Sequence, residues 1–217
     1  MKFQETKLRD VYLQQMVEVQ NRLAATEIYF TAYAENGDEI DFDSGVLQIR
    51  KALESLAYAS IAPNKPQYQA FRKKAETNKD FTKDFNASKI IHNLLQVNKD
   101  FYPVPLFPPI KLGDHRWHYN RKTDGILSQR RFQRFYDRLG KFLHADNPWD
   151  SNKQRQNLAK DIDVLIDQAR SLLELHAAFI RAIDYTGVWV VEVPKDNSAP
   201  TIISAVASGE FIIDSSS

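Results

Sequence analysis

The sequence predicts a mainly α-helical fold, a helical bundle with a short β-hairpin or meander at the C-terminus. Apolar residues recur at steps of three and four through most of residues 3–184, which is the period of an amphipathic helix. The runs "VWVVEV" and "TIISAV", which follow Gly187, are rich in β-branched residues, as strands are. We therefore expect a helical-bundle domain over residues 1–185. A β appendage over residues 186–217 would pack on the same domain.

Apolar periodicity outlines two helices at the start of the chain. The first spans residues 3–34, and Asn36-Gly37 breaks it. The second has Asp43 or Ser44 as its cap, continues to Ile61, and ends before Pro63 and Pro66. The residues expected on the buried sides of these helices are Leu8, Tyr12, Met16, Val19, Leu23, Leu47, Leu53, Leu56 and Ala57.

The remaining helices are expected on both sides of a proline-rich segment. Helical patterns cover residues 68–83 and 86–98, the latter with Asn86 or Ser88 near its cap. Four prolines in seven positions, Pro103 to Pro109, exclude a regular helix there, and the segment should lie across a surface. Helical period returns over residues 127–144 and 150–184. All strands should then follow residue 186, with "EFII" as a third one.

Composition narrows the class of protein. The 29 basic and 28 acidic residues give a net charge of +1, so binding to nucleic acid would need a local basic patch. Without cysteine there can be no disulfide, thiolate zinc site or cysteine nucleophile. No glycine-rich phosphate loop is present, and we expect no cofactor. No run of 18 apolar residues and no leader occur, so we expect a soluble cytoplasmic protein without membrane partners.

One predicted helix, over residues 127–144, carries an unusual charge pattern. Its apolar side would hold Phe132, Phe135, Tyr136, Leu139, Phe142 and Leu143. Beside it, Arg131, Arg134, Arg138 and Lys141 follow one another at steps of three and four. Like charges so close either face an anionic partner or form an ordinary solvated surface. The sequence leaves both alternatives open.

The same helix ends with an arginine and a histidine, Arg138 and His144, which have five residues between them. In a straight helix these two side chains would not meet. They would converge if the last turn unwound before Asp146-Asn147-Pro148, or across the two-fold axis of a homodimer. Alternatively, Arg138 pairs with a carboxylate and His144 caps the helix C-terminus.

The pair resembles the motif of the HEPN superfamily, in which histidine follows arginine after four to six residues. "IRKALESLAYA", Ile49–Ala59, is also similar to the early helix of several HEPN-like proteins. Leu139 departs from the pattern, since active HEPN ribonucleases usually carry a polar residue directly after the arginine. The resemblance implies a dimeric helical bundle that cleaves RNA without a metal, in bacterial toxin–antitoxin or antiviral defence systems.

Roles for individual residues follow from that resemblance. His144 would take the proton from a ribose 2′-hydroxyl, and Arg138 would hold the phosphate as charge develops. Arg131, Arg134 and Lys141 would bind the RNA backbone. The other function class is a non-enzymatic protein-interaction module on the same fold, with the proline-rich loop and C-terminal strands as its binding surface.

A second candidate segment is "GDHRWHYNRK", residues 113–122. His115 and His118 with Asp114 could be metal ligands, although a turn packed around Trp117 and Tyr119 explains them better. Arg116 and Arg121 among these aromatic residues would suit single-stranded RNA or a protein partner. His92 and His176 lie in apolar helical patterns and are expected to be core or boundary residues.

Overall fold

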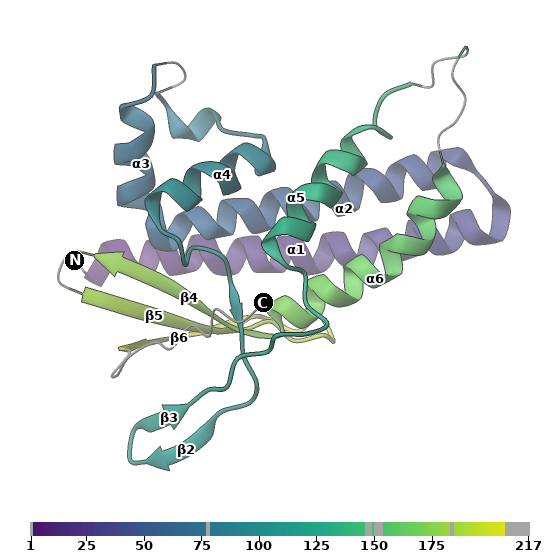
Figure 1. Cartoon of the computed structure of the whole chain (residues 1–217). Helices are drawn as coiled ribbons and strands as arrows, with labels where there is room; N and C mark the ends of the chain where they lie inside the picture. Colours follow the sequence, from purple (N-terminus) through teal and green to yellow (C-terminus); the bar gives the residue numbers. More distant parts are fainter. Residues whose placement is uncertain (1, 77–78, 146–148, 150–153, 183–184, 207–217) are drawn as a thin grey trace.

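Two long antiparallel helices frame the structure (Figure 1). The computed structural model describes residues 2–76, 79–145, 149, 154–182 and 185–206. Helix α1 (Lys2–Asn36) turns at Gly37, whose φ of 71° favours glycine, into helix α2 (Glu39–Ile61). The first helix and its stop are confirmed. The predicted cap of the second is wrong, because Asp38 accepts a hydrogen bond from the Ile40 N–H and starts α2 earlier.

Short helices follow and gather beside the C-terminal end of α2 (Figure 1). They are a 3-10 turn at Ala62–Asn64, α3 (Lys65–Lys73), a second 3-10 turn at Phe81–Lys83, and α4 (Ala87–Val97). The single helix predicted over residues 68–83 is therefore wrong. Pro66 lies in the first turn of α3, where its missing N–H costs no hydrogen bond, so it begins a helix there. Asn86 caps α4, as predicted, by accepting a hydrogen bond from the Lys89 N–H.

The last two helices, α5 (Gln129–Gly140) and α6 (Arg155–Leu173), complete the bundle. The helix predicted over residues 150–184 is too long, because the chain leaves α6 at Leu173 and continues as strand β4 (Leu175–Ala182). All eight residues of β4 pair with strand β5 (Tyr185–Glu192). This pairing outweighs the helical tendency of a segment that is rich in leucine and alanine.

An antiparallel sheet lies along one side of the helices, in the order β1-β4-β5-β6. Its outer strands are β1 (Val104–Pro105) and β6 (Thr201–Val206). The C-terminal meander is confirmed, but the expectation that every strand follows residue 186 is wrong. A separate hairpin, β2 (Ile110–Gly113) with β3 (Arg116–His118), also precedes it. The "EFII" segment lies outside the described residues.

The central strands β4 and β5 carry buried side chains on both faces of the sheet. One face packs on α1, where the rings of Tyr12 and Trp189 meet edge to face with centroids 5.8 Å apart. The other carries a separate apolar cluster made of Leu106, Ala177, Phe179, Val188 and Val190. Leu47 and Leu143, which were predicted to be buried, are 39% and 37% exposed. In α2 the buried side chain at this place is that of the neighbouring residue Val46, so Leu47 points away from the core. Leu143 lies beyond the end of α5.

None of the helices in the described part of the chain is both long and apolar enough to cross a bilayer. Even α1, with 35 residues, carries charged side chains along its length. The apolar side of α1 packs into the main core instead, where Met16, Val19 and Leu23 are buried.

Candidate functional site

Helix α5 presents an apolar face to the core and a basic face outward. The Ser128 hydroxyl caps it by accepting a hydrogen bond from the Arg131 N–H. Its buried side chains are Phe132, Phe135, Tyr136 and Leu139, as the helical wheel predicted. The expected extension to His144 is wrong, because Gly140 ends the helix. The Lys141 N–H donates to Arg138 and the Phe142 N–H to Leu139 in a tightened last turn.

Contacts to α2 fix the rotation of α5 about its axis. The guanidinium of Arg50 lies 3.9 Å from the centroid of the Tyr136 ring and donates hydrogen bonds to the Tyr136 carbonyl and hydroxyl. The Tyr136 hydroxyl in turn donates to Glu54 at 2.9 Å. Because Tyr136 is held on the α2 side, the arginines of α5 are turned toward α6.

An open cleft of about 390 Å³ lies where α5 faces α6. We call it the arginine cleft, and its lining residues are Ser128, Arg130, Arg131, Arg134, Phe135, Arg138 and Asp161. Four guanidinium groups against one carboxylate give the lining a strongly positive charge. Within the described part of the chain, no salt bridge joins Arg130, Arg131 or Arg134 to a carboxylate. Three cations of the cleft therefore have no carboxylate partner among the residues that the structure describes.

The ring of Phe135 holds two of these arginines in place. The guanidinium carbon of Arg131 lies 5.3 Å from the ring centroid, and that of Arg138 lies 5.9 Å from it. Phe135 itself is only 6% exposed, so the ring is a fixed platform. Such cation–π contacts orient a guanidinium without using its N–H donors, which stay available for an anion.

Asp161, on α6, is the one acidic side chain of the cleft. Its Oδ2 accepts a hydrogen bond from Nη1 of Arg138 at 2.5 Å. The two side chains are 46% and 33% exposed, so solvent screens the pair and its contribution to stability is small. The pair matters for the charge of the cleft, because the Asp161 carboxylate occupies one side of the Arg138 guanidinium while the other charged lining residues are cations.

The cleft brings together some of the predicted site residues and leaves out others. Arg131, Arg134 and Arg138 line it, whereas Lys141 and His144 do not. Arg116 and Arg121 lie on the segment that contains β2 and β3. The sequence interpretation missed Arg130 and Asp161. Arg130 stands four residues before Arg134 and could have been found by its spacing, but no local pattern indicates that Asp161 faces α5.

Arg138 and His144 do not share a helix. Residues 141–145 are non-helical, so the last turn has unwound, and His144 is exposed there. The alternative in which Arg138 pairs with a carboxylate is confirmed by Asp161, while the residue that caps α5 is Lys141 rather than His144. His144 therefore lies just after the end of the helix that carries Arg138, but it does not line the cleft.

The other histidines differ in their surroundings. His176 is fully buried, and its Nε2 lies 2.7 Å from the Tyr12 hydroxyl. His92 is exposed on α4, and His115 and His118 are exposed at the β2–β3 hairpin. Within the described residues, no group of three or more His, Cys, Asp or Glu side chains could hold a metal ion.

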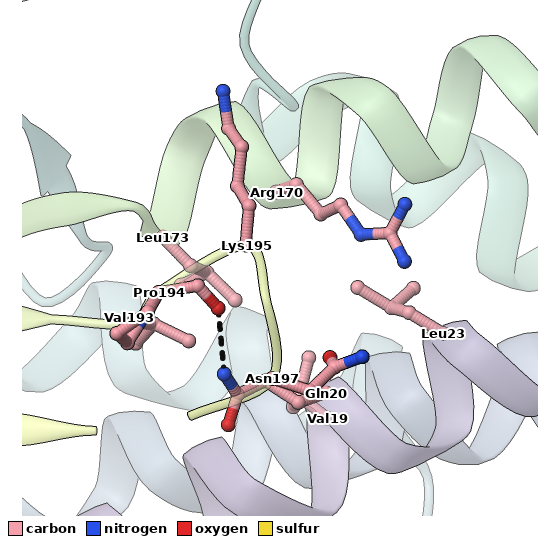
Figure 2. A pocket seen from close by; sticks show the side chains of 9 residues that line it. All are labelled: Val19, Gln20, Leu23, Arg170, Leu173, Val193, Pro194, Lys195 and Asn197. Atoms are coloured by element: carbon pink, nitrogen blue, oxygen red, sulfur yellow. Dashed lines mark hydrogen bonds between the residues drawn. The ribbon is translucent and has the colours of Figure 1, made fainter. Parts of the chain in front are cut away.

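A second cavity, between α1 and the strand-connecting residues 193–197, is too small for a ligand (Figure 2). Its volume is about 10 Å³, which is the space of one water molecule. Gln20 crosses it and donates from Nε2 to the Pro194 carbonyl at 2.8 Å. This cavity belongs to the packing of the sheet on α1.

Of these two cavities, the arginine cleft is the one with both the size and the charge to bind a ligand. Its volume lies in the range of sites for small molecules or single nucleotides. The chain matches no family model, and no curated protein or solved structure is significantly similar to it.

Proposed function

We propose that this protein binds RNA, with the phosphates of the backbone held in the arginine cleft. The observation that supports the proposal is the set of four arginines on three successive turns of α5, and three of these arginines have no carboxylate partner among the described residues. A guanidinium offers a planar pair of N–H donors that matches two phosphate oxygens. The cytoplasm is the compartment that fits this ligand and the cysteine-free sequence.

The direct test removes two arginines whose side chains are exposed, so that the packing of the core stays intact. In Arg130→Gln/Arg134→Gln, affinity for a fluorescein-labelled single-stranded 20-mer RNA should fall about 25-fold at 0.1 M salt. Fluorescence anisotropy titrations at several salt concentrations give the affinity, and the salt slope should decrease by about 1.4 for the two lost phosphate contacts.

The matched control is Lys73→Gln/Lys74→Gln, which removes the same charge from exposed positions at the end of α3. This variant should bind like the wild type. If both double variants lost affinity equally, binding would depend on overall charge and the cleft would not be the site. If the wild type bound no RNA, the protein-interaction module would become the better explanation of the fold.

The acidic residue of the cleft allows a test with the opposite sign. Asp161→Asn should raise RNA affinity about fivefold at 0.1 M salt, because Arg138 is freed for one more phosphate. Thermal stability should change little, since the ion pair is partly exposed. Asp163→Asn, which removes an exposed carboxylate from the same helix, is the control. Equal or weaker binding by Asp161→Asn would contradict the role given to Arg138.

RNA cleavage is a second candidate, favoured by the exposed position of His144 just after the helix end that carries Arg138. In this HEPN-like proposal, His144 is the base and Arg138 stabilises the phosphate as negative charge builds on its oxygens. His144→Ala should abolish cleavage of mixed RNA and leave binding intact. Arg138→Lys should also be severe, because lysine keeps the charge but loses the bidentate contact. Chelators should have no effect.

Cleavage and binding can fail separately. If RNA bound in the cleft but no cleavage product appeared, the protein would bind RNA without cleaving it. Cleavage that survives in His144→Ala would exclude this histidine as the base. The homodimer, the HEPN kinship and a place in toxin–antitoxin or antiviral systems remain parts of this proposal.

A further inference from the structure

A β-ribbon extends from the edge of the sheet away from the helices (Figure 1). We call residues 107–121 the basic ribbon; it contains β2 and β3. The two strands pair antiparallel, with Ile110 opposite His118 and Lys111 opposite Trp117. A bulge at Leu112 interrupts the pairing before the turn.

The base of the ribbon is anchored, while its outer part is not packed. The Phe107 N–H donates to the Asn120 carbonyl, and the Lys122 N–H donates to the Pro105 carbonyl. Lys122 also forms an ion pair with Glu174 at 2.9 Å, which ties the base to the start of β4. The ribbon therefore keeps a fixed origin on the sheet edge and presents its strands to solvent.

Large apolar side chains of the ribbon are exposed. Ile110 is 52% exposed, Leu112 64% and Trp117 53%. A two-stranded hairpin without a buried face is at best marginally stable in water. Exposed apolar groups gathered on such an element mark a surface that binds something.

The charge of the ribbon indicates what that ligand is. Lys111, Arg116 and Arg121 are exposed cations, and Asp114 is the one acidic residue of the segment. Lys111 stands directly across from Trp117, so both side chains leave the same face of the ribbon. An indole beside an ammonium group suits a stacked base with its phosphate alongside. The turn itself is polar, at Asp114 and His115, which disfavours insertion of the tip into a lipid bilayer.

We infer that the basic ribbon is a second contact for single-stranded RNA, with one base stacked on Trp117 and a phosphate beside Lys111 on the same face. The choice of RNA as the ligand rests on the function proposed for the arginine cleft. The ribbon adds base stacking, which the cleft lacks, and stacking favours unpaired over double-stranded RNA.

The experiment uses Trp117 as its own reporter. Trp189 is buried, and Trp149 is removed as Trp149→Phe, so Trp117 is the exposed tryptophan that remains. Adding a 15-nucleotide oligouridylate should quench the Trp117 fluorescence, because stacking on a base shortens the excited-state lifetime of the indole. In anisotropy titrations with the same RNA, Trp117→Ala should lose about five- to 160-fold in affinity, whereas Trp117→Phe should retain most of it.

The contributions of the arginine cleft and the basic ribbon are distinguished by measuring Trp117 quenching in the cleft variant. In Arg130→Gln/Arg134→Gln, binding should be weaker but saturating RNA should still quench Trp117. If Trp117 were quenched normally while the cleft variant bound like the wild type, the RNA contact at the ribbon would be supported and the RNA site in the cleft would be contradicted. The ribbon inference is overturned if Trp117→Ala, with an unchanged thermal midpoint, binds the RNA as tightly as the wild type.

Two further outcomes would also overturn it. One is a blue shift of Trp117 emission with vesicles of phosphatidylcholine and phosphatidylserine but no response to RNA, which would assign the ribbon to a membrane surface. The other is a Trp117→Ala variant that changes only the sedimentation of the protein, which would assign the ribbon to contact with a second copy of the chain.

Discussion

Replacement of Leu139 by alanine is expected to lower the free energy of unfolding by about 2 to 5 kcal/mol. Leu139 is fully buried in the main core, on the face of α5 opposite to the solvent. Removing three carbons there leaves a cavity, because Leu139 belongs to a close-packed core cluster, which also holds Tyr136 and Phe142 and cannot collapse freely. Urea denaturation followed by circular dichroism measures the loss.

Leu143→Ala is the matched control for this change. The same side chain is removed four residues later, but Leu143 is 37% exposed, and the expected loss is below about 1 kcal/mol. Similar losses in the two variants would mean that α5 is rotated from the orientation described here. The arginines would then no longer face α6, so this stability measurement also tests the geometry of the cleft.

Acid should destabilise the protein through one buried histidine. Burial lowers the pKa of His176 to about 4 from its ordinary value of 6.5, although a hydrogen bond to the Leu173 carbonyl opposes the shift. A carbonyl only accepts, so Nδ1 carries the proton, and Nε2 accepts a hydrogen bond from the Tyr12 hydroxyl. Protonation of Nε2 in the folded state would oppose that hydrogen bond inside the core.

The direction of the pH effect follows from the lowered pKa. Above pH 6.5 the histidine is neutral in both states and the stability is fully present. As the pH falls toward 4, the unfolded chain binds a proton that the folded protein does not. The free energy of unfolding should fall by close to 1.4 kcal/mol per pH unit around pH 5, and by about 3 kcal/mol in all.

Urea denaturation at pH 7.5, 6.5, 5.5 and 5.0 measures this loss before most carboxylates titrate. In Tyr12→Phe/His176→Leu, apolar groups replace both members of the hydrogen bond, so no partner is left unsatisfied. That variant should show a much flatter profile over the same range. An unchanged slope in it would assign the acid sensitivity to other groups.

The sequence was informative where structure depends on neighbouring residues. The stripe of α1, the Asn36-Gly37 stop and the Asn86 cap are local patterns, and all three are present in the structure. The buried side of α5 was also predicted correctly from its period, up to Leu139.

Errors arose where distant residues decide the conformation. Nothing in "LHAAFIRA" excludes a helix, and pairing with β5 and β1 makes it a strand. The same limit applies to the site. The arginine stripe of α5 is visible in the sequence, but Asp161 joins it through the packing of two helices that are far apart in the chain.

Helix α1 depends on strands near the C-terminus, and this has a consequence for the time course of biosynthesis. Arg9 donates to the Ile202 carbonyl across 193 residues, and Gln20 reaches Pro194 in the same way. At about 5 to 20 residues per second, a ribosome needs roughly 10 to 40 s to make the chain between such partners. During that interval α1 can pair with α2, but the side that receives the sheet stays uncovered. The nascent protein should therefore be most prone to aggregation, and most dependent on chaperones, just before β5 and β6 emerge.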